Sequence, residues 1–223
     1  MIGDILLFND YHHVGTELII DFLKKLDIKI PYSLSVSGES GSGKTEIAQL
    51  LKEKLEEQGK RVMVLGQDDY FRLPPHSNHQ QRKIDINWVG PMEVQLIWMN
   101  YNVQKLVQPE GTIVFKPLIH FTEDKIDTEY VTGPYDIVIA EGTYTALLGD
   151  IDVRIFINRD YKETKKHRLS RNRDQALEND SDHDLTFLEK ILQIEHRIIK
   201  KHIKKADLVI PPPDVLLEDK KIS

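Results

Sequence analysis

The chain contains no cysteine among its 223 residues. Disulfide bonds, cysteine-ligated metal sites and thiol catalysis are therefore excluded, and this composition fits the reducing cytosol. No apolar run approaches the roughly 20 residues that a membrane-spanning helix needs. The first residues also lack the basic segment and apolar core of a signal peptide. We therefore expect a cytoplasmic protein that has no membrane partner.

The chain also has fewer basic than acidic residues. The chain has 30 Lys and Arg residues against 36 Asp and Glu, a formal net charge of −6. This balance argues against broad binding to nucleic acid, so we expect no nucleic-acid partner. Apolar residues make up 40% and charged residues 30%, as in a globular protein large enough for one substantial domain. A homo-oligomer is compatible with this composition.

One octapeptide carries more chemical information than the rest of the chain. Gly38-Glu39-Ser40-Gly41-Ser42-Gly43-Lys44-Thr45 matches the pattern G-x-x-x-x-G-K-[ST] at every fixed position. Glycines let backbone N–H groups turn inward around phosphate oxygens. We expect Lys44 to reach the β- and γ-phosphates and the Thr45 hydroxyl to ligate Mg²⁺. The octapeptide therefore predicts a nucleotide site that takes ATP and Mg²⁺ as cofactors.

Apolar segments typical of buried strands alternate with helical patterns along the chain. The expected strands are 32–37, 61–65, 136–140, 153–157 and 208–210, and the expected helices are 14–26, 45–58, 91–106, 161–177 and 185–204. This alternation predicts an α/β fold of the P-loop NTPase type, with three layers and a mostly parallel sheet flanked by helices. We expect a helical extension packed on the core over 1–30 and a catalytic domain over 31–213. The domain would carry a small lid at about 174–186, and 214–223 would be a loosely held tail.

Carboxylates follow two of the expected strands, at the sheet edge where open α/β folds bind ligands. Asp68 and Asp69 begin the long polar segment 66–87. Either one can accept the proton of a hydroxyl nucleophile, and the alternative is a solvated turn or a helix cap. Glu141 ends an apolar run, where a buried carboxylate needs a partner. The expected partner of Glu141 is Mg²⁺ beside a bound triphosphate. The alternative is that Glu141 caps the next helix.

The segment 161–177 is strongly basic. A solvated helix face is the usual explanation of such a run. Arg171 and Arg173 are nevertheless candidates for stabilising the transferring phosphate from a closing lid. The histidines are interpreted as surface or loop residues without zinc-site spacing. His120 is the exception, because it follows an apolar stretch near the expected substrate cleft.

Taken in order, these segments resemble the uridine kinase and phosphoribulokinase family of P-loop kinases. The resemblance runs from about Ser33 to Pro211. It rests on the octapeptide, Gln67-Asp68-Asp69-Tyr70-Phe71, Asp136 to Gly142, Arg168-Leu169-Ser170-Arg171-Asn172-Arg173-Asp174, and Ala206 to Pro211.

The resemblance also implies site roles. Asp68 would be the catalytic base and would join Thr45 and Glu141 in the Mg²⁺ environment. Lys44 and Arg173 would act on the transferring phosphate, and Arg171 would bind the nucleotide phosphates. The resemblance implies a contact between Asp85 and the acceptor sugar. Asp69, Tyr70, Phe71 and His120 are further candidates for contacts to the acceptor.

The departures from that family fall on the acceptor side. Uridine kinases tend to carry Asp-His-Pro where this chain has 85–91, and Tyr-Asp-Phe where it has 119–121. Their basic Glu-Arg-Gly-Arg lid is replaced by the acidic segment 178–181. Lost hydrogen-bonding partners matter greatly for specificity.

We therefore predict a kinase that transfers the γ-phosphate of ATP to a hydroxyl, with a nucleoside such as uridine or cytidine favoured as the small-molecule partner. The alternatives are a kinase for another small hydroxyl metabolite (a sugar, pantothenate-like or sulfate-nucleotide acceptor), a toxin-like kinase acting on a nucleotide sugar, and a nucleotide-binding regulator without turnover.

Overall fold

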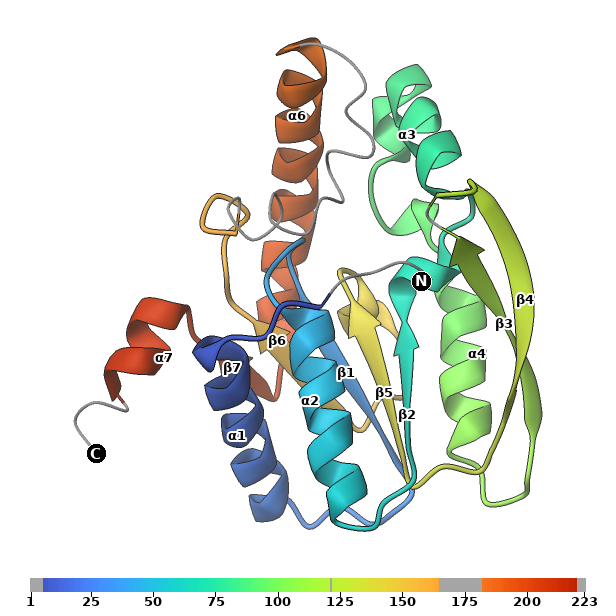
Figure 1. Cartoon of the computed structure of the whole chain (residues 1–223), viewed down its shortest axis with the longest axis vertical. Coiled ribbons are helices and arrows are strands. Elements are labelled where there is room, and N and C mark those ends of the chain that lie inside the picture. The colour runs from blue at the N-terminus through green and yellow to red at the C-terminus, as the bar shows by residue number, and fades with distance from the viewer. Residues whose placement is uncertain (1–5, 121, 165–181, 220–223) are drawn as a thin grey trace.

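The computed structural model describes residues 6–120, 122–164 and 182–219. Its centre is a five-stranded sheet with the order β2-β5-β1-β6-β7, in which every neighbouring pair is parallel (Figure 1). In chain order these strands are β1 (Tyr32–Gly38), β2 (Val62–Gly66), β5 (Ile137–Gly142), β6 (Val153–Ile157) and β7 (Leu208–Ile210). Every residue of β1 and β5 is buried, as expected for parallel strands covered on both faces.

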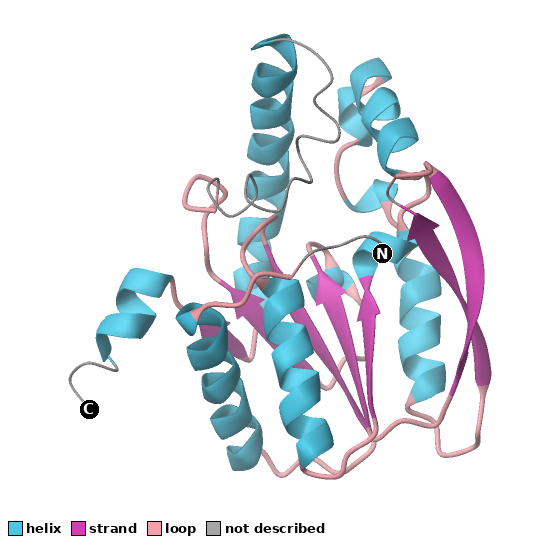
Figure 2. Ribbon diagram, in the orientation of Figure 1, coloured by secondary structure: helices cyan, strands magenta, loops and turns pink. Residues whose placement is uncertain are grey.

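Helices cover both faces of this sheet (Figure 2). On one face lie α1 (Asp10–Lys25) and α2 (Lys44–Glu57), which contribute Ile19 and Leu51 to one apolar cluster. On the other face, α4 (Leu96–Leu106) and the end of α6 (Asp182–Ile199) contribute Met99 and Ile199 to a second cluster. The predicted α/β fold, a mostly parallel sheet between two layers of helices, is confirmed.

The first helix begins four residues earlier than its apolar spacing predicts. Asn9 explains the difference, because its side chain accepts a hydrogen bond from the His12 backbone N–H while the His12 ring accepts one from the Asn9 backbone N–H. This reciprocal cap satisfies N–H groups at the helix N-terminus. The ring of His12 is thereby held at the start of the helix.

One helix and a β-hairpin were not predicted. The segment 66–87, expected to be a long loop, contains α3 (Pro75–Ile84). The short apolar stretch at 113–115 opens β3 (Ile113–His120), which pairs antiparallel with β4 (Lys125–Thr132). β4 carries exposed polar residues and α3 is polar along most of its length, while Lys116 and Pro117 interrupt the apolar run of β3, so the apolar signal of each is weak. The helix expected over 91–106 is divided into a 3₁₀ turn, Pro91–Glu93, and α4.

The C-terminal part of the chain also differs from expectation. α6 begins at Asp182 and is followed by a 3₁₀ helix, Lys200–Lys205. The loosely held tail is instead helix α7 (Pro213–Asp219), whose Leu216 is buried in the first apolar cluster. Most of the expected lid and of the basic helix falls on 165–181, outside the described residues. Across the described ranges, no helix combines the length and apolar character needed to cross a membrane.

Candidate active site

The octapeptide forms the turn between β1 and α2. Gly43 has φ +97°, and a Cβ at this position would lie 2.6 Å from Nε2 of His12, which is fully buried behind the turn. Gly38 has φ +155°, and a Cβ there would lie 2.8 Å from the Ile157 carbonyl oxygen. Only glycine fits these positions without displacing a neighbour. The structure therefore shows the conformation that the glycine pattern predicts.

Gly43→Ala is expected to weaken ATP binding by about tenfold or more. The new methyl group would strike the His12 ring, and a positive φ costs a residue with a Cβ roughly 1–2 kcal/mol. Isothermal titration with ATP and Mg²⁺ measures the effect. Gly59→Ala is the matched control, since Gly59 has φ +78° but no atom within 4 Å of its Cβ position. If the Gly43 variant binds ATP like the wild type, this account of the turn is wrong.

Four groups with the chemistry of a phosphate and metal site lie around one cleft. Lys44 is buried and its Nζ donates to the Glu39 carbonyl oxygen at 2.8 Å. The Thr45 hydroxyl donates to Glu141 Oε2 at 3.4 Å. Asp68 lines the same cleft as these side chains. Strand order explains the convergence, because β5 lies between β1 and β2 and the carboxyl ends of all three meet at one edge.

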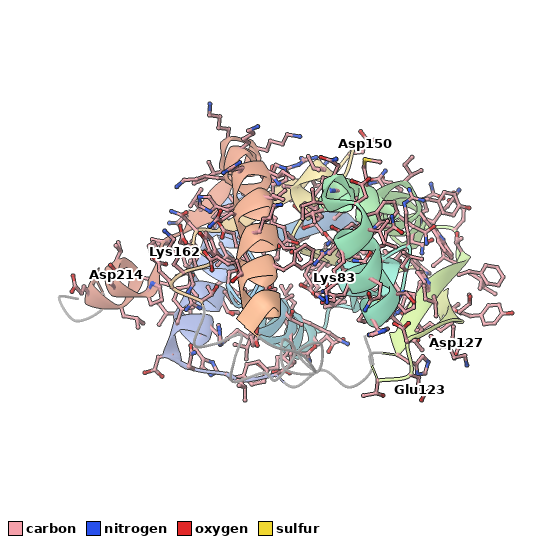
Figure 3. All side chains as sticks on the ribbon, turned by 90° about the horizontal axis from the view of Figure 1, so that it is seen from above. Lys83, Glu123, Asp127, Asp150, Lys162 and Asp214 are labelled. Carbon is pink, nitrogen blue, oxygen red and sulfur yellow. The ribbon has the colours of Figure 1, made fainter. Side chains whose placement is uncertain are left out.

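The cleft extends from the P-loop to α3 and α6, which stand side by side above the sheet edge in two views (Figures 1 and 3). Its lining is polar near the P-loop and mostly apolar farther away. The lining residues are Ser40, Gly41, Gly43, Lys44, Thr45, Asp68, Phe71, Leu73, Pro75, Asn78, His79, Arg82, Ile119, Glu141, Thr143, Leu188, Ile191, Leu192 and Glu195.

Two expected acceptor contacts, Asp69 and Tyr70, do not line this cleft. Asp69 is buried, and its carboxylate accepts hydrogen bonds from Lys116 Nζ at 3.0 Å and from the Ile119 N–H at 3.1 Å. Tyr70 is fully buried in the second apolar cluster, with its hydroxyl bonded to Asn102. Residues 67–70 form a 3₁₀ helix, in which successive side chains are turned by about 120°. Asp68 therefore faces the cleft, while Asp69 bonds to the β3–β4 hairpin and Tyr70 packs in the core.

Asp85 and His120 also lie away from the cleft. Asp85 is exposed and caps the turn after α3 by accepting from the Asn87 backbone and side chain. His120 Nε2 lies 3.1 Å from Asp127, on the hairpin at the side of the molecule away from α6 (Figure 3). Side chains alternate across a strand, so Ile119 faces the cleft and His120 does not. Of the expected acceptor contacts, Phe71 is the one that lines it.

The histidines are not all surface or loop residues. His12, His79 and His202 are buried, and His196 on α6 contacts the P-loop. Its Nδ1 lies 2.6 Å from Glu39 Oε1, while Glu39 Oε2 accepts from the Tyr161 N–H at 2.7 Å. Burial raises the pKa of Glu39, and His196 opposes that rise. This contact ties α6 to the phosphate-binding turn.

A charge cluster between α3 and α6, two of whose members (Arg82 and Glu195) line the cleft, was missed by sequence reasoning. Arg82 on α3 donates twice to Glu93 Oε2, at 2.9 and 2.6 Å, and once to Glu195 Oε1, at 3.2 Å. Burial raises the pKa of Glu195 to about 7, Arg82 and Lys44 lower it, and Glu93 and Glu39 add to the rise. Asn78, His79 and Arg82 follow helical spacing, the one signal in the sequence for this wall. Arg171 and Arg173 lie outside the described residues.

Known proteins with similar sequences or folds are mostly kinases. A family model described as Zeta toxin matches residues 21–107. The uridine kinase of Latilactobacillus sakei is 26% identical over 187 residues, which cover 82% of this chain and 86% of that protein. A possible uridine kinase from Bacillus stearothermophilus has the same fold, with a TM-score of 0.62 and 16% identity over 88% of this chain and 97% of the other.

Two further solved structures share the fold. A putative fructose transport system kinase from Silicibacter sp. TM1040 superposes with a TM-score of 0.60 and 19% identity, covering 87% of this chain and 98% of the other. Phosphoribulokinase from Rhodobacter spheroides has a TM-score of 0.59 and 13% identity, and the match covers 80% of this chain and 68% of the other. The predicted resemblance of this chain to the uridine kinase and phosphoribulokinase family of P-loop kinases is therefore confirmed.

Proposed function

We propose that this chain is an ATP-dependent kinase that transfers the γ-phosphate to a hydroxyl of a nucleoside, with uridine or cytidine favoured. One observation carries the proposal: Asp68 lies in the same cleft as Lys44 of the phosphate-binding turn. A protein that only binds a nucleotide has no need of a base there. A kinase needs a carboxylate that accepts the hydroxyl proton as the nucleophile aligns with the phosphate.

Different residues around the cleft would bind the phosphates, accept the proton and hold the metal ion. The glycine turn and Lys44 would hold the phosphates, and Asp68 would take the proton of the acceptor hydroxyl. Thr45, Glu141 and Asp68 would hold Mg²⁺, and their hydroxyl and carboxylate oxygens are the ligands that this ion prefers. The 3.4 Å contact between Thr45 and Glu141 already brings two such oxygens together. When bound, Mg²⁺ neutralises charge on the β- and γ-phosphate oxygens.

The wall of the cleft supports a nucleoside acceptor. Phe71, Leu188 and Leu192 present apolar surface to a compound held near Asp68. A flat nucleobase can bury its faces against such a wall, whereas a small sugar would leave it uncovered. The competing candidate is a kinase for another hydroxyl metabolite, which the names of the fructose transport system kinase and phosphoribulokinase favour.

An acceptor screen tests the proposal. The protein is incubated with ATP and Mg²⁺ and with nucleosides, sugars, nucleotide sugars or pantothenate, and the release of ADP is measured. We expect release that depends on uridine or cytidine. Tight ATP binding without stimulation by any acceptor would instead support a regulator and overturn the kinase proposal.

A further inference from the structure

Across the described ranges, one histidine and two carboxylates bring three metal-ligand atoms within 4.8 Å of one another. They are Glu39 in the phosphate-binding turn, Asp160 in the segment after β6, and His196 on α6. These three side chains are not among the described residues that line the cleft. Figures 1 and 3 both show the segment after β6 on the side of α6 that is turned away from α3. The cluster is therefore distinct from the proposed Mg²⁺ site inside the cleft.

Both carboxylates are held with one oxygen near the histidine. Glu39 Oε2 accepts from the Tyr161 N–H at 2.7 Å, and Glu39 Oε1 lies 2.6 Å from His196 Nδ1. Asp160 Oδ1 accepts from the Lys162 N–H at 2.9 Å, and Asp160 Oδ2 lies 3.8 Å from the same imidazole nitrogen. Hydrogen bonds to the outer oxygen orient metal-ligating carboxylates in the same way. The backbone of the segment after β6 therefore prepares both carboxylates as ligands.

The cluster carries more negative than positive charge, because two carboxylates share one imidazole. The pKa of Glu39 reflects this imbalance. Burial raises it most and the charge of Asp160 adds to the rise, while His196 and a backbone N–H lower it. A third carboxylate, Glu163, accepts from the Asp160 N–H at 3.3 Å. Buried charges of this kind are usually paired or coordinate a metal, and a divalent cation would compensate both carboxylates at once.

The spacing of the ligand atoms suits a tetrahedral ion. Bonds of about 2.0–2.2 Å to nitrogen and oxygen place two ligand atoms of a tetrahedral zinc ion roughly 3.4 Å apart. The separations from His196 Nδ1, 2.6 Å to Glu39 and 3.8 Å to Asp160, lie on either side of this value. The side chains of His196 and Asp160 are 22% and 34% exposed, so an ion can enter from solvent. Water can then fill the fourth position.

We propose that Glu39, Asp160 and His196 form a binding site for a divalent transition metal ion, with Zn²⁺ favoured over Mg²⁺. Imidazole nitrogen is a good ligand for Zn²⁺, whereas Mg²⁺ prefers an octahedral shell of oxygens. The ion would join α6 and the segment after β6 to the phosphate-binding turn. The three ligands lie far apart in the chain, so no local zinc-site spacing marks them in the sequence. This inference does not depend on the proposed kinase function.

Metal titration of the full chain, first stripped of metal with a chelator, tests the site. In the presence of excess Mg²⁺, we expect one equivalent of Zn²⁺ to bind by isothermal titration. At a hundredfold excess over Kd, Zn²⁺ should raise the Tm by roughly 5–10 °C, because it binds the folded state. His196→Ala should weaken binding by more than about 100-fold, since removing a residue that only orients a ligand already costs about 10- to 100-fold.

Three further variants serve as controls. His13→Ala removes an exposed histidine of α1 outside the cluster and should bind Zn²⁺ like the wild type. Asp160→Asn replaces a partly exposed ligand by a side chain of the same shape, so it reports on the site even if His196→Ala fails to fold. It should weaken binding at least about tenfold. Glu141→Gln removes a ligand of the proposed Mg²⁺ site and should leave Zn²⁺ binding intact.

Each contrary result overturns the site. A wild-type chain that binds no stoichiometric Zn²⁺ refutes it directly. Zn²⁺ binding that survives unchanged in both His196→Ala and Asp160→Asn is binding elsewhere on the surface. Loss of binding in Glu141→Gln, with His196→Ala unaffected, would place the ion in the cleft instead. None of these measurements uses ATP turnover, so their failure and the failure of the acceptor screen are distinguishable.

Discussion

Lys44→Ala is expected to reduce acceptor-dependent ADP release by at least about 10²- to 10³-fold, the cost of removing a donor aimed at developing charge. Lys44 is buried at the start of α2 and lines the cleft. Its ammonium group is already desolvated, so its interaction with a phosphate is less screened than a surface contact would be. Steady-state ADP release and ATP titration measure the loss of turnover and of binding.

Lys54→Ala provides the control on the same helix. Lys54 lies at the far end of α2, where its ammonium group pairs with Glu17 at the surface. Surface ion pairs contribute about 0–1 kcal/mol, so this variant should keep wild-type activity and lose little stability. Wild-type turnover by Lys44→Ala, with a normal Tm, would rule out the phosphate-binding role of the octapeptide.

Asp68→Asn is expected to lower the turnover number by roughly 10²–10⁴, the usual effect of losing a general base. The amide cannot accept the acceptor proton but occupies the same space. ATP binding should change much less, because the glycine turn and Lys44 remain in place. Comparison of turnover and ATP affinity in the two proteins therefore separates loss of the base from loss of the nucleotide site.

Asp69→Asn is the neighbouring control, and it should act on stability instead. Its carboxylate pairs with Lys116, and both side chains are buried. Removing one member of a buried ion pair costs about 3–5 kcal/mol, so the Tm should fall while the turnover of the folded protein is largely kept. If Asp69→Asn instead removes turnover at an unchanged Tm while Asp68→Asn is active, Asp69 is the base.

The most accurate predictions came from segments whose backbone is determined locally. The glycines of the octapeptide adopt the positive φ angles that their pattern requires, and the strands at 153–157 and 208–210 have the predicted bounds. Short apolar strands between helices specify a parallel sheet because only that arrangement buries both of their faces. Hence the phosphate site, Asp68 and Glu141 could all be placed at one sheet edge in advance.

The acceptor side could not be predicted in this way. The 3₁₀ turn at 67–70 separates Asp68 from Asp69 and Tyr70, and two consecutive carboxylates in a sequence carry no sign of which one faces a cleft. α3 and the hairpin are stabilised by packing and by contacts such as Asp69 with Lys116 rather than by strong apolar periodicity of their own. Their existence was therefore missed.

By itself, the sequence determined the kind of chemistry: an anion-binding turn, carboxylates at the strand ends and an α/β sheet to hold them. The tertiary structure alone decided which side chains share the cleft. Arg82 and Glu195 are 113 positions apart, and they meet because α3 and α6 lie side by side above the same edge of the sheet. Contacts of this range depend on how whole elements pack, which no local pattern of residues records.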